Sequence, residues 1–158
     1  HDAAQTRVSE RLATLPASER AASEPRVLGG LATYAEQWAT MQREACLTHH
    51  ERVRQTAVIA APDELREEEV MACIVARHPE DVVDPAHREA LARELFDWCF
   101  ERMAYFKAPG WILFVDSLPM GTSAKVQKIH IFPQGTDPRA QPGAIDLRSL
   151  KKQKKAAH

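Results

Sequence analysis

The sequence has few cysteine, glycine and aromatic residues, whose abundance would point directly to a structural class. Among 158 residues there are only three cysteines, six glycines and 6% aromatic residues. Cys46, Cys73 and Cys99 are widely spaced and have apolar neighbours, whereas a disulfide framework or a zinc site needs close pairs or four ligands. We therefore predict three buried thiols, a reducing environment and a cytoplasmic protein.

The sequence also lacks an excess of charge and any long hydrophobic run. Its 21 basic and 22 acidic residues give a net charge of −1, which excludes a strongly basic surface for nucleic acid or an anionic membrane. Ala57–Ala61 and Trp111–Val115 are far too short to span a bilayer, and no charged-then-apolar leader opens the chain. We expect a folded protein with no nucleic-acid partner and no membrane span.

Common catalytic and metal-binding motifs are missing as well. There is no GxxxxGK[ST] phosphate loop, no GxGxxG, no HExxH and no GxSxG. The side chains of His49 and His50 would diverge by roughly 100° on a helix, so they do not converge on one ion. Glu67, Glu68 and Glu69 could attract Mg²⁺, but a solvated acidic loop between two strands is the commoner arrangement. We predict no metal site.

Residues 1–42 predict a helical N-terminal arm that is separate from residues 43–158. Val8, Leu12 and Leu15 fit one short helix that stops at Pro16. After breaks at Pro25 and Gly29-Gly30, a second helical pattern runs from about Leu31 to His49. Its apolar residues recur at spacings of three and four, which places them on one face.

Residues 43–132 alternate strand and helix patterns. Short apolar β-rich runs predict strands over Thr56–Ala61, Val70–Ala76 and Trp111–Val115. Asp84 is a predicted N-cap for a helix that ends before Pro109. The residues from Leu118 to Lys128 predict a β-hairpin. This order favours an α+β fold, with a small three-stranded sheet flanked by helices, a β-hairpin and the N-terminal arm.

The remaining residues, 133–158, predict an extended segment that ends in a solvated tail. Proline, glycine and aspartate are frequent up to Pro142. The tail is rich in lysine and contains Lys151, Lys152, Lys154 and Lys155.

The predicted hairpin is the best candidate site. Its small residues from Gly121 to Ala124 leave the backbone open and set hydroxyl groups beside Lys125. A flexible ammonium next to small residues suits an anion such as a phosphoryl group. A solvated surface lysine on a hairpin has the same composition, so the spacing leaves both interpretations open.

Three stretches in order resemble a known family. They read EACLTHHERVRQTAVIAAPDELREEEVMACIVA (44–76), ARELFDWCFERMAYFKAP (92–109) and WILFVDSLPMGTSAKVQK (111–128). Family members read approximately EAVLLxHPxVxxAAVVAVPDExxGEExxAxVV and LAxFKVPxxIxFVDxLPxTxSGKIQK. The chain thus resembles, from about Arg43 to Lys155, the C-terminal domain of AMP-forming acyl-CoA synthetases, the adenylate-forming ligase superfamily. The ending IHIFPQGTDPRAQPGAIDLRSLKKQKK looks like the crotonobetaine/carnitine-CoA ligase branch.

The resemblance implies a role in fatty acid metabolism, in which a carboxylate, ATP and CoA give acyl-CoA, AMP and pyrophosphate. It assigns Lys125 to adenylation, where it contacts the carboxylate and the phosphate and ribose oxygens. Weaker substrate and CoA assignments fall on Thr122, Ser123, Arg66, Tyr105 and Lys107. ATP with Mg²⁺ and CoA would be co-substrates of the complete enzyme, and none would be held tightly by this chain. The expected partner is a large N-terminal adenylation domain, without which the chain would be inactive.

The sequence departs from the family pattern at three places. Ala124 stands at the motif glycine, which matters if that residue needs a positive φ. A second family glycine registers with Arg66, whose side chain would obstruct the pantetheine path or add a cation for CoA phosphates. The family hinge motif is absent, and GGLATYAEQWATMQ occupies its place. The alternative function is therefore a non-catalytic protein-interaction module from a truncated or fused ligase gene, which binds a partner through the N-terminal arm and the helix Leu31–Thr48.

Overall fold

The computed structural model describes residues 10–64 and 67–156. The chain divides into two compact units, and the boundary lies between Gln42 and Arg43.

The first unit is helical. Residues 10–13 form a turn of helix with Leu12 buried, and Val8 lies outside the described residues. Helix α2 (Ala17–Thr48) then runs into the second unit without a break. The predicted breaks at Pro25 and at Gly29-Gly30 are wrong. A proline removes one helical hydrogen bond and a glycine lowers helix propensity, but neither forbids helix where the neighbouring residues favour it.

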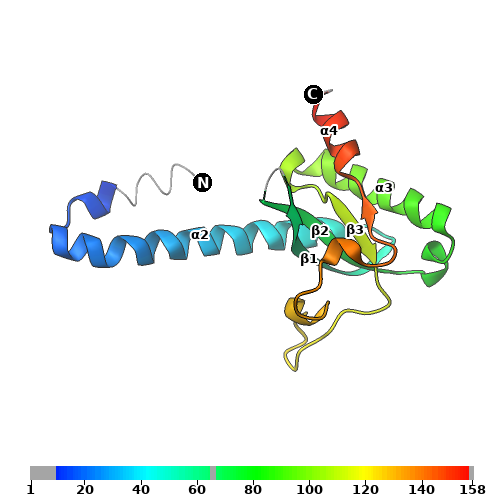
Figure 1. Ribbon diagram of the computed structural model, residues 1–158, viewed down its shortest axis with the longest axis horizontal. Helices are drawn as coiled ribbons and strands as arrows, with labels where there is room; N and C mark the ends of the chain where they lie inside the picture. Colours follow the sequence, from blue (N-terminus) through cyan, green and yellow to red (C-terminus); the bar gives the residue numbers. More distant parts are fainter. Residues whose placement is uncertain (1–9, 65–66, 157–158) are drawn as a thin grey trace. The chain divides into compact units, whose positions relative to one another are not determined.

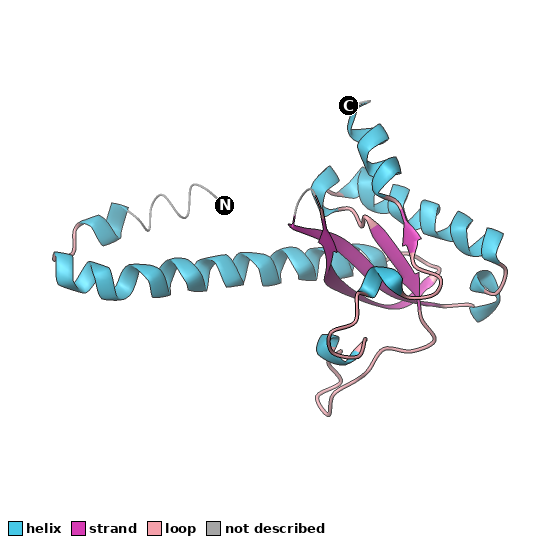
Figure 2. Cartoon of the chain, viewed as in Figure 1, coloured by secondary structure: helices cyan, strands magenta, loops and turns pink. Residues whose placement is uncertain are grey.

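The second unit is built on a four-stranded mixed sheet (Figures 1 and 2). Its strands, in spatial order, are β1 (Val53–Asp63), β2 (Glu67–Ala76), β3 (Trp111–Phe114) and β4 (Ile145–Asp146). The pairs β1–β2 and β3–β4 are antiparallel, and β2–β3 is parallel. The sequence predicted the first three strands and missed β4, because a strand of two residues carries no alternating pattern.

Helix α3 (Pro85–Arg102) covers one face of this sheet. It begins as predicted, since the Asp84 carboxylate accepts a hydrogen bond from the backbone N–H of His87 at 2.9 Å. Leu95 and Phe96 pack there with Ala72 and Ile74 of β2.

The loops that follow β3 cover the opposite face, where Cys73, Val75 and Leu118 form a second buried cluster. Strand β2 is therefore buried on both faces, which explains its continuous apolar run. Burial raises the pKa of the Cys73 thiol to about 12. Cys73 and Cys99 are buried free thiols as predicted, whereas Cys46 is half-buried.

Short 3₁₀ turns connect these elements. They are η1 (Pro79–Val82), η2 (Tyr105–Lys107), η3 (Lys128–His130) and η4 (Pro138–Ala140). In the described ranges, no helix is both long and apolar enough to cross a membrane.

The C-terminal segment contradicts the prediction of an extended, solvated tail. After η4 it adds β4 to the sheet and ends in helix α4 (Arg148–Ala156). Lys151 is only 1% exposed, and its ammonium lies 2.7 Å from a carboxylate oxygen of Glu69. Glu69, which the sequence placed in a solvated acidic loop, is 5% exposed and belongs to β2. A charge can be buried when it is paired, so composition misplaced both residues.

Gly110 fits tightly against this buried pair. A Cβ on Gly110 would lie 2.4 Å from Cγ of Glu69. We therefore expect Gly110→Ala to displace the Glu69 side chain and to lower the free energy of unfolding by about 1–3 kcal/mol. Urea denaturation measures this, with Gly29→Ala as the control, because a Cβ on Gly29 meets open space in a helix. A Gly110→Ala chain as stable as wild type would contradict the tight packing.

Candidate functional site

The predicted hairpin is present in minimal form and carries the candidate lysine. Met120 and Val126 form a single antiparallel bridge. The N–H of Gly121 donates to the carbonyl of Lys125 at 2.8 Å, and the N–H of Gln127 donates to the carbonyl of Pro119 at 2.8 Å. We call residues 119–127 the lysine loop. Because the bridge closes its ends, Lys125 is presented on a defined turn.

The side chains at the turn face solvent. Thr122, Ser123 and Lys125 are all exposed. Within the described part of the chain, the Lys125 ammonium has no acidic partner and no hydrogen bond. The exposed and unpaired Lys125 ammonium therefore remains available for an anion from outside.

The base of the lysine loop is attached to the rest of the unit through Glu44 near the end of α2. One oxygen of the Glu44 carboxylate accepts a hydrogen bond from the N–H of Val58 at 2.8 Å and also pairs with the Lys128 ammonium. Glu44 thus joins α2, β1 and the residue that follows the loop. The charge of Lys128 is compensated there, which distinguishes it from Lys125.

Ala124 adopts a left-handed conformation, with φ of 55°. A residue with a Cβ is strained by about 1–2 kcal/mol in this region, whereas glycine is not. Ala124, which stands where the family has glycine, is therefore strained, and it lies immediately before Lys125.

This strain predicts that Ala124→Gly stabilises the chain. We expect a gain of about 0.5–1 kcal/mol, because the relief of strain exceeds the extra entropy that glycine has in the unfolded chain. Thermal denaturation measures it, with Ala104→Gly as the control, since Ala104 is exposed and has an ordinary φ of −57°. The control should lose stability. Equal losses in both variants would contradict a strained Ala124.

The other predicted site residues lie at the opposite end of β3. Tyr105 and Lys107 belong to η2, which precedes β3, whereas the lysine loop follows it (Figure 1). The structure therefore does not bring Tyr105 and Lys107 together with Lys125. Arg66 lies outside the described residues. Among the described residues of that turn, Glu67 has a positive φ of 66°, a conformation that favours glycine.

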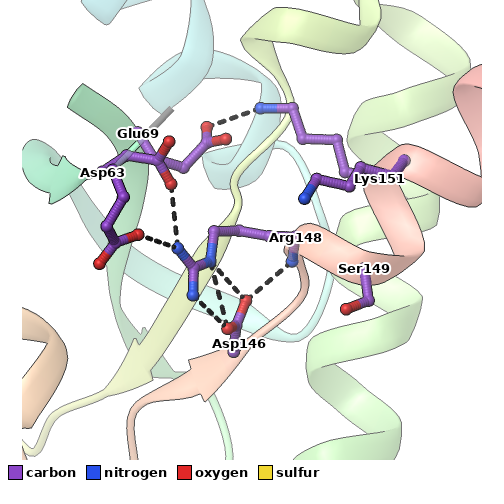
Figure 3. Close-up of a pocket in the computed structure, with 8 residues that line it drawn as sticks. Asp63, Glu69, Asp146, Arg148, Ser149 and Lys151 are labelled. Atoms are coloured by element: carbon purple, nitrogen blue, oxygen red, sulfur yellow. Dashed lines mark hydrogen bonds and ion pairs between the residues drawn. The ribbon is translucent and has the colours of Figure 1, made fainter. Parts of the chain in front are cut away.

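A charged cluster beside η2 was missed from the sequence (Figure 3). It lines a pocket of about 300 Å³ between the β1–β2 turn and α4. Arg148 donates hydrogen bonds to Asp146 at 2.8 Å and to Asp63 at 3.0 Å. Both bonds raise the pKa of the Arg148 guanidinium, and the bond to Asp146 has the larger effect. Lys151 pairs with Glu69 in the same cluster.

Arg43 is electrostatically linked to the cluster. Burial lowers the pKa of its guanidinium, and the negative charge of Glu69 opposes that shift. The spacing of three between Arg148, Lys151 and Lys154 was the available sequence signal for the cluster, but the partners Asp63, Glu69 and Asp97 are distant in the chain.

Of the two adjacent histidines, His50 packs inside the second unit and His49 is exposed. His50 is 6% exposed, its Nε2 lies 3.3 Å from Glu94, and its ring packs edge-on against Trp98. No group of three or more potential His, Cys, Asp or Glu ligands occurs in residues 10–64 and 67–156.

Comparison with known proteins places the lysine loop in a family context. The family model for the AMP-binding enzyme C-terminal domain matches residues 42–125. The chain belongs to this family. The match begins beside the boundary between the two units and ends at Lys125, so it includes strands β1 to β3, α3 and most of the lysine loop, but not β4.

Relatives of the chain are acyl-CoA ligases. The crotonobetaine/carnitine–CoA ligase of Proteus mirabilis is 30% identical over 61% of this chain and 17% of its own length. A mitochondrial acyl-coenzyme A synthetase of Homo sapiens is 38% identical over 58% of this chain and 15% of its own. The chain spans 12–17% of the length of these curated relatives and of a medium-chain acyl-CoA ligase of Macaca fascicularis.

Solved structures of this family share the fold. The acyl-CoA synthetase of Brucella canis aligns with a TM-score of 0.51 and 26% identity, over 73% of this chain and 18% of its own. The o-succinylbenzoate CoA synthetase of Bacillus subtilis, in complex with an acyl-adenylate intermediate, gives the same TM-score and identity over 67% of this chain and 19% of its own. The predicted α+β fold and family are thus confirmed.

Proposed function

We propose that this chain is the C-terminal lid domain of an ATP-dependent, AMP-forming acyl-CoA ligase and that Lys125 serves its adenylation step. The observation that carries this proposal is the exposed Lys125, without an acidic partner in the described residues, on a turn closed by the Met120–Val126 bridge. Attack of a carboxylate on the α-phosphorus of ATP joins two anions. An ammonium between them offsets their repulsion and the charge that develops in the transition state.

The proposal assigns the remaining parts of the reaction to a large adenylation domain. That domain would hold the carboxylic acid and ATP with Mg²⁺, and this chain would add Thr122, Ser123 and Lys125. The η2 side, with Tyr105, Lys107 and the turn that contains Arg66, would face CoA in the thioester step. A cytoplasmic location and a place in the crotonobetaine/carnitine-CoA ligase branch belong to the same proposal.

An isolated lid domain should be inactive. We expect the purified 158-residue chain to give no ATP–pyrophosphate exchange with a panel of carboxylic acids, because a single lysine on one turn does not bind ATP and an acid together. Adding the large domain of the Proteus mirabilis ligase, cut before its matching segment, should produce acyl-CoA. Robust exchange by the chain alone, or no thioester from the mixture, would overturn the proposal.

A second candidate function rests on Met41 in the first unit. This residue is 61% exposed, and exposed apolar side chains on a helix are a common feature of protein-interaction surfaces. Under this alternative the helix binds another protein and Lys125 has no catalytic role. Gel filtration and pull-down of the chain, compared with Met41→Lys, separate the two functions, since only the interaction module would lose a partner with this substitution.

A further inference from the structure

Three cations on α4 attach this helix to three different elements. Arg148, Lys151 and Lys154 follow one another at spacings of three, which places them along one side of the helix. Arg148 contacts Asp63 at the end of β1, and Lys154 donates to Asp97 of α3 at 2.7 Å. Lys151, between them, is the buried member.

Lys151 makes more than an ion pair. Its ammonium donates to Glu69 at 2.7 Å, to the carbonyl of Ala108 at 2.8 Å and to the carbonyl of Phe106 at 3.4 Å (Figure 3 shows the pair with Glu69). An ammonium has three donors. They reach the beginning of β2 on one side and the chain at η2 on the other.

These contacts place Lys151 between η2 and the beginning of β2, two segments that are also linked nearby by the hydrogen bond from the N–H of Gly110 to the carbonyl of Val70. Phe106 belongs to η2 and Ala108 follows it, whereas Glu69 lies in β2, two residues after the strand begins at Glu67 beside the β1–β2 turn. We propose that Lys151 is a positioning residue that fixes η2 against this turn, and thereby sets the CoA-facing side of the domain. The role in CoA use rests on the proposed function, whereas the role in fixing η2 does not.

Stability alone does not require this arrangement. Well-packed apolar residues can replace a buried ion pair without loss of stability. They cannot donate hydrogen bonds to the carbonyls of Phe106 and Ala108, as the Lys151 ammonium does. The Lys151 ammonium, with its N–H donors, is therefore needed to place η2. Two leucines at positions 69 and 151 would make no such bonds to η2.

The test separates positioning from stability with a double variant. Glu69→Leu combined with Lys151→Leu removes both charges together and leaves a foldable chain, while Glu69→Gln keeps the Lys151 bonds to the two carbonyls. Lys152→Leu is the matched control, because Lys152 is an exposed lysine next to Lys151 on the same helix. Each chain is followed by amide hydrogen exchange, and then in the mixture with the large domain by the KM for CoA and the rate of adenylation.

We expect at least tenfold faster exchange at residues 105–108 in the double variant, with unchanged exchange in the lysine loop. Its KM for CoA should rise at least tenfold while adenylation stays within twofold. Glu69→Gln and Lys152→Leu should stay within threefold of wild type in both measurements. Unchanged exchange at 105–108, or an equal loss in both half-reactions, would overturn the proposal. If the wild-type mixture makes no thioester, the proposed function fails, and the exchange data still decide whether Lys151 fixes η2.

Discussion

Replacing Lys125 by alanine should lower the rate of acyl-adenylate formation by about 10²–10³-fold in the mixture with a large adenylation domain, because one preorganised electrostatic donor contributes about that much to a transition state. The folded chain should be unaffected, since the Lys125 ammonium makes no contact in the described residues that would be lost. ATP–pyrophosphate exchange measures the rate, and thermal denaturation measures the stability.

Lys152→Ala is the matched control for this experiment. It removes an exposed lysine from α4, at the far end of β3 from the lysine loop, and should leave the exchange rate within twofold of wild type. If Lys125→Ala and the control exchange at the same rate, Lys125 is an ordinary solvated residue and the proposed chemistry is wrong.

Removing the Lys151 charge alone should cost the second unit about 3–5 kcal/mol of stability, because it leaves the Glu69 carboxylate buried without its main partner. Lys151→Leu removes an ammonium that is 1% exposed and makes three hydrogen bonds. Urea denaturation at neutral pH measures the loss.

The double variant with Glu69→Leu should recover most of this loss and come within about 2 kcal/mol of wild type, since no unpaired carboxylate remains. Lys152→Leu should change the free energy of unfolding by less than about 0.5 kcal/mol as the exposed control. A double variant no more stable than the single one would show that the pair is not the origin of the loss.

The parts of the fold that the sequence predicted are those encoded by neighbouring residues. The Asp84 cap acts on His87, three residues away, and β2 has a continuous apolar run because both of its faces are buried. The lysine loop was predicted for the same reason, since its small residues and Lys125 are consecutive.

The parts that were missed depend on partners far apart in the chain. Lys151 and Glu69 are separated by 82 positions, and β4 is a strand only because Trp111 pairs with Asp146. The lysine-rich composition of the C-terminal segment predicted that it is solvated, because an unpaired lysine is normally exposed to solvent. The unbroken α2 was missed for a different reason, because proline and glycine weaken a helix without always ending it.

The central claim is that this chain completes an adenylating enzyme by bringing Lys125 to a large domain. Its most direct test is a titration, in which the rate of acyl-adenylate formation by a fixed amount of the large domain is measured as wild-type chain is added. We expect this rate to rise and saturate with the chain, and to stay at the starting level when Lys125→Ala is added instead. A rate that does not depend on the added chain would contradict it.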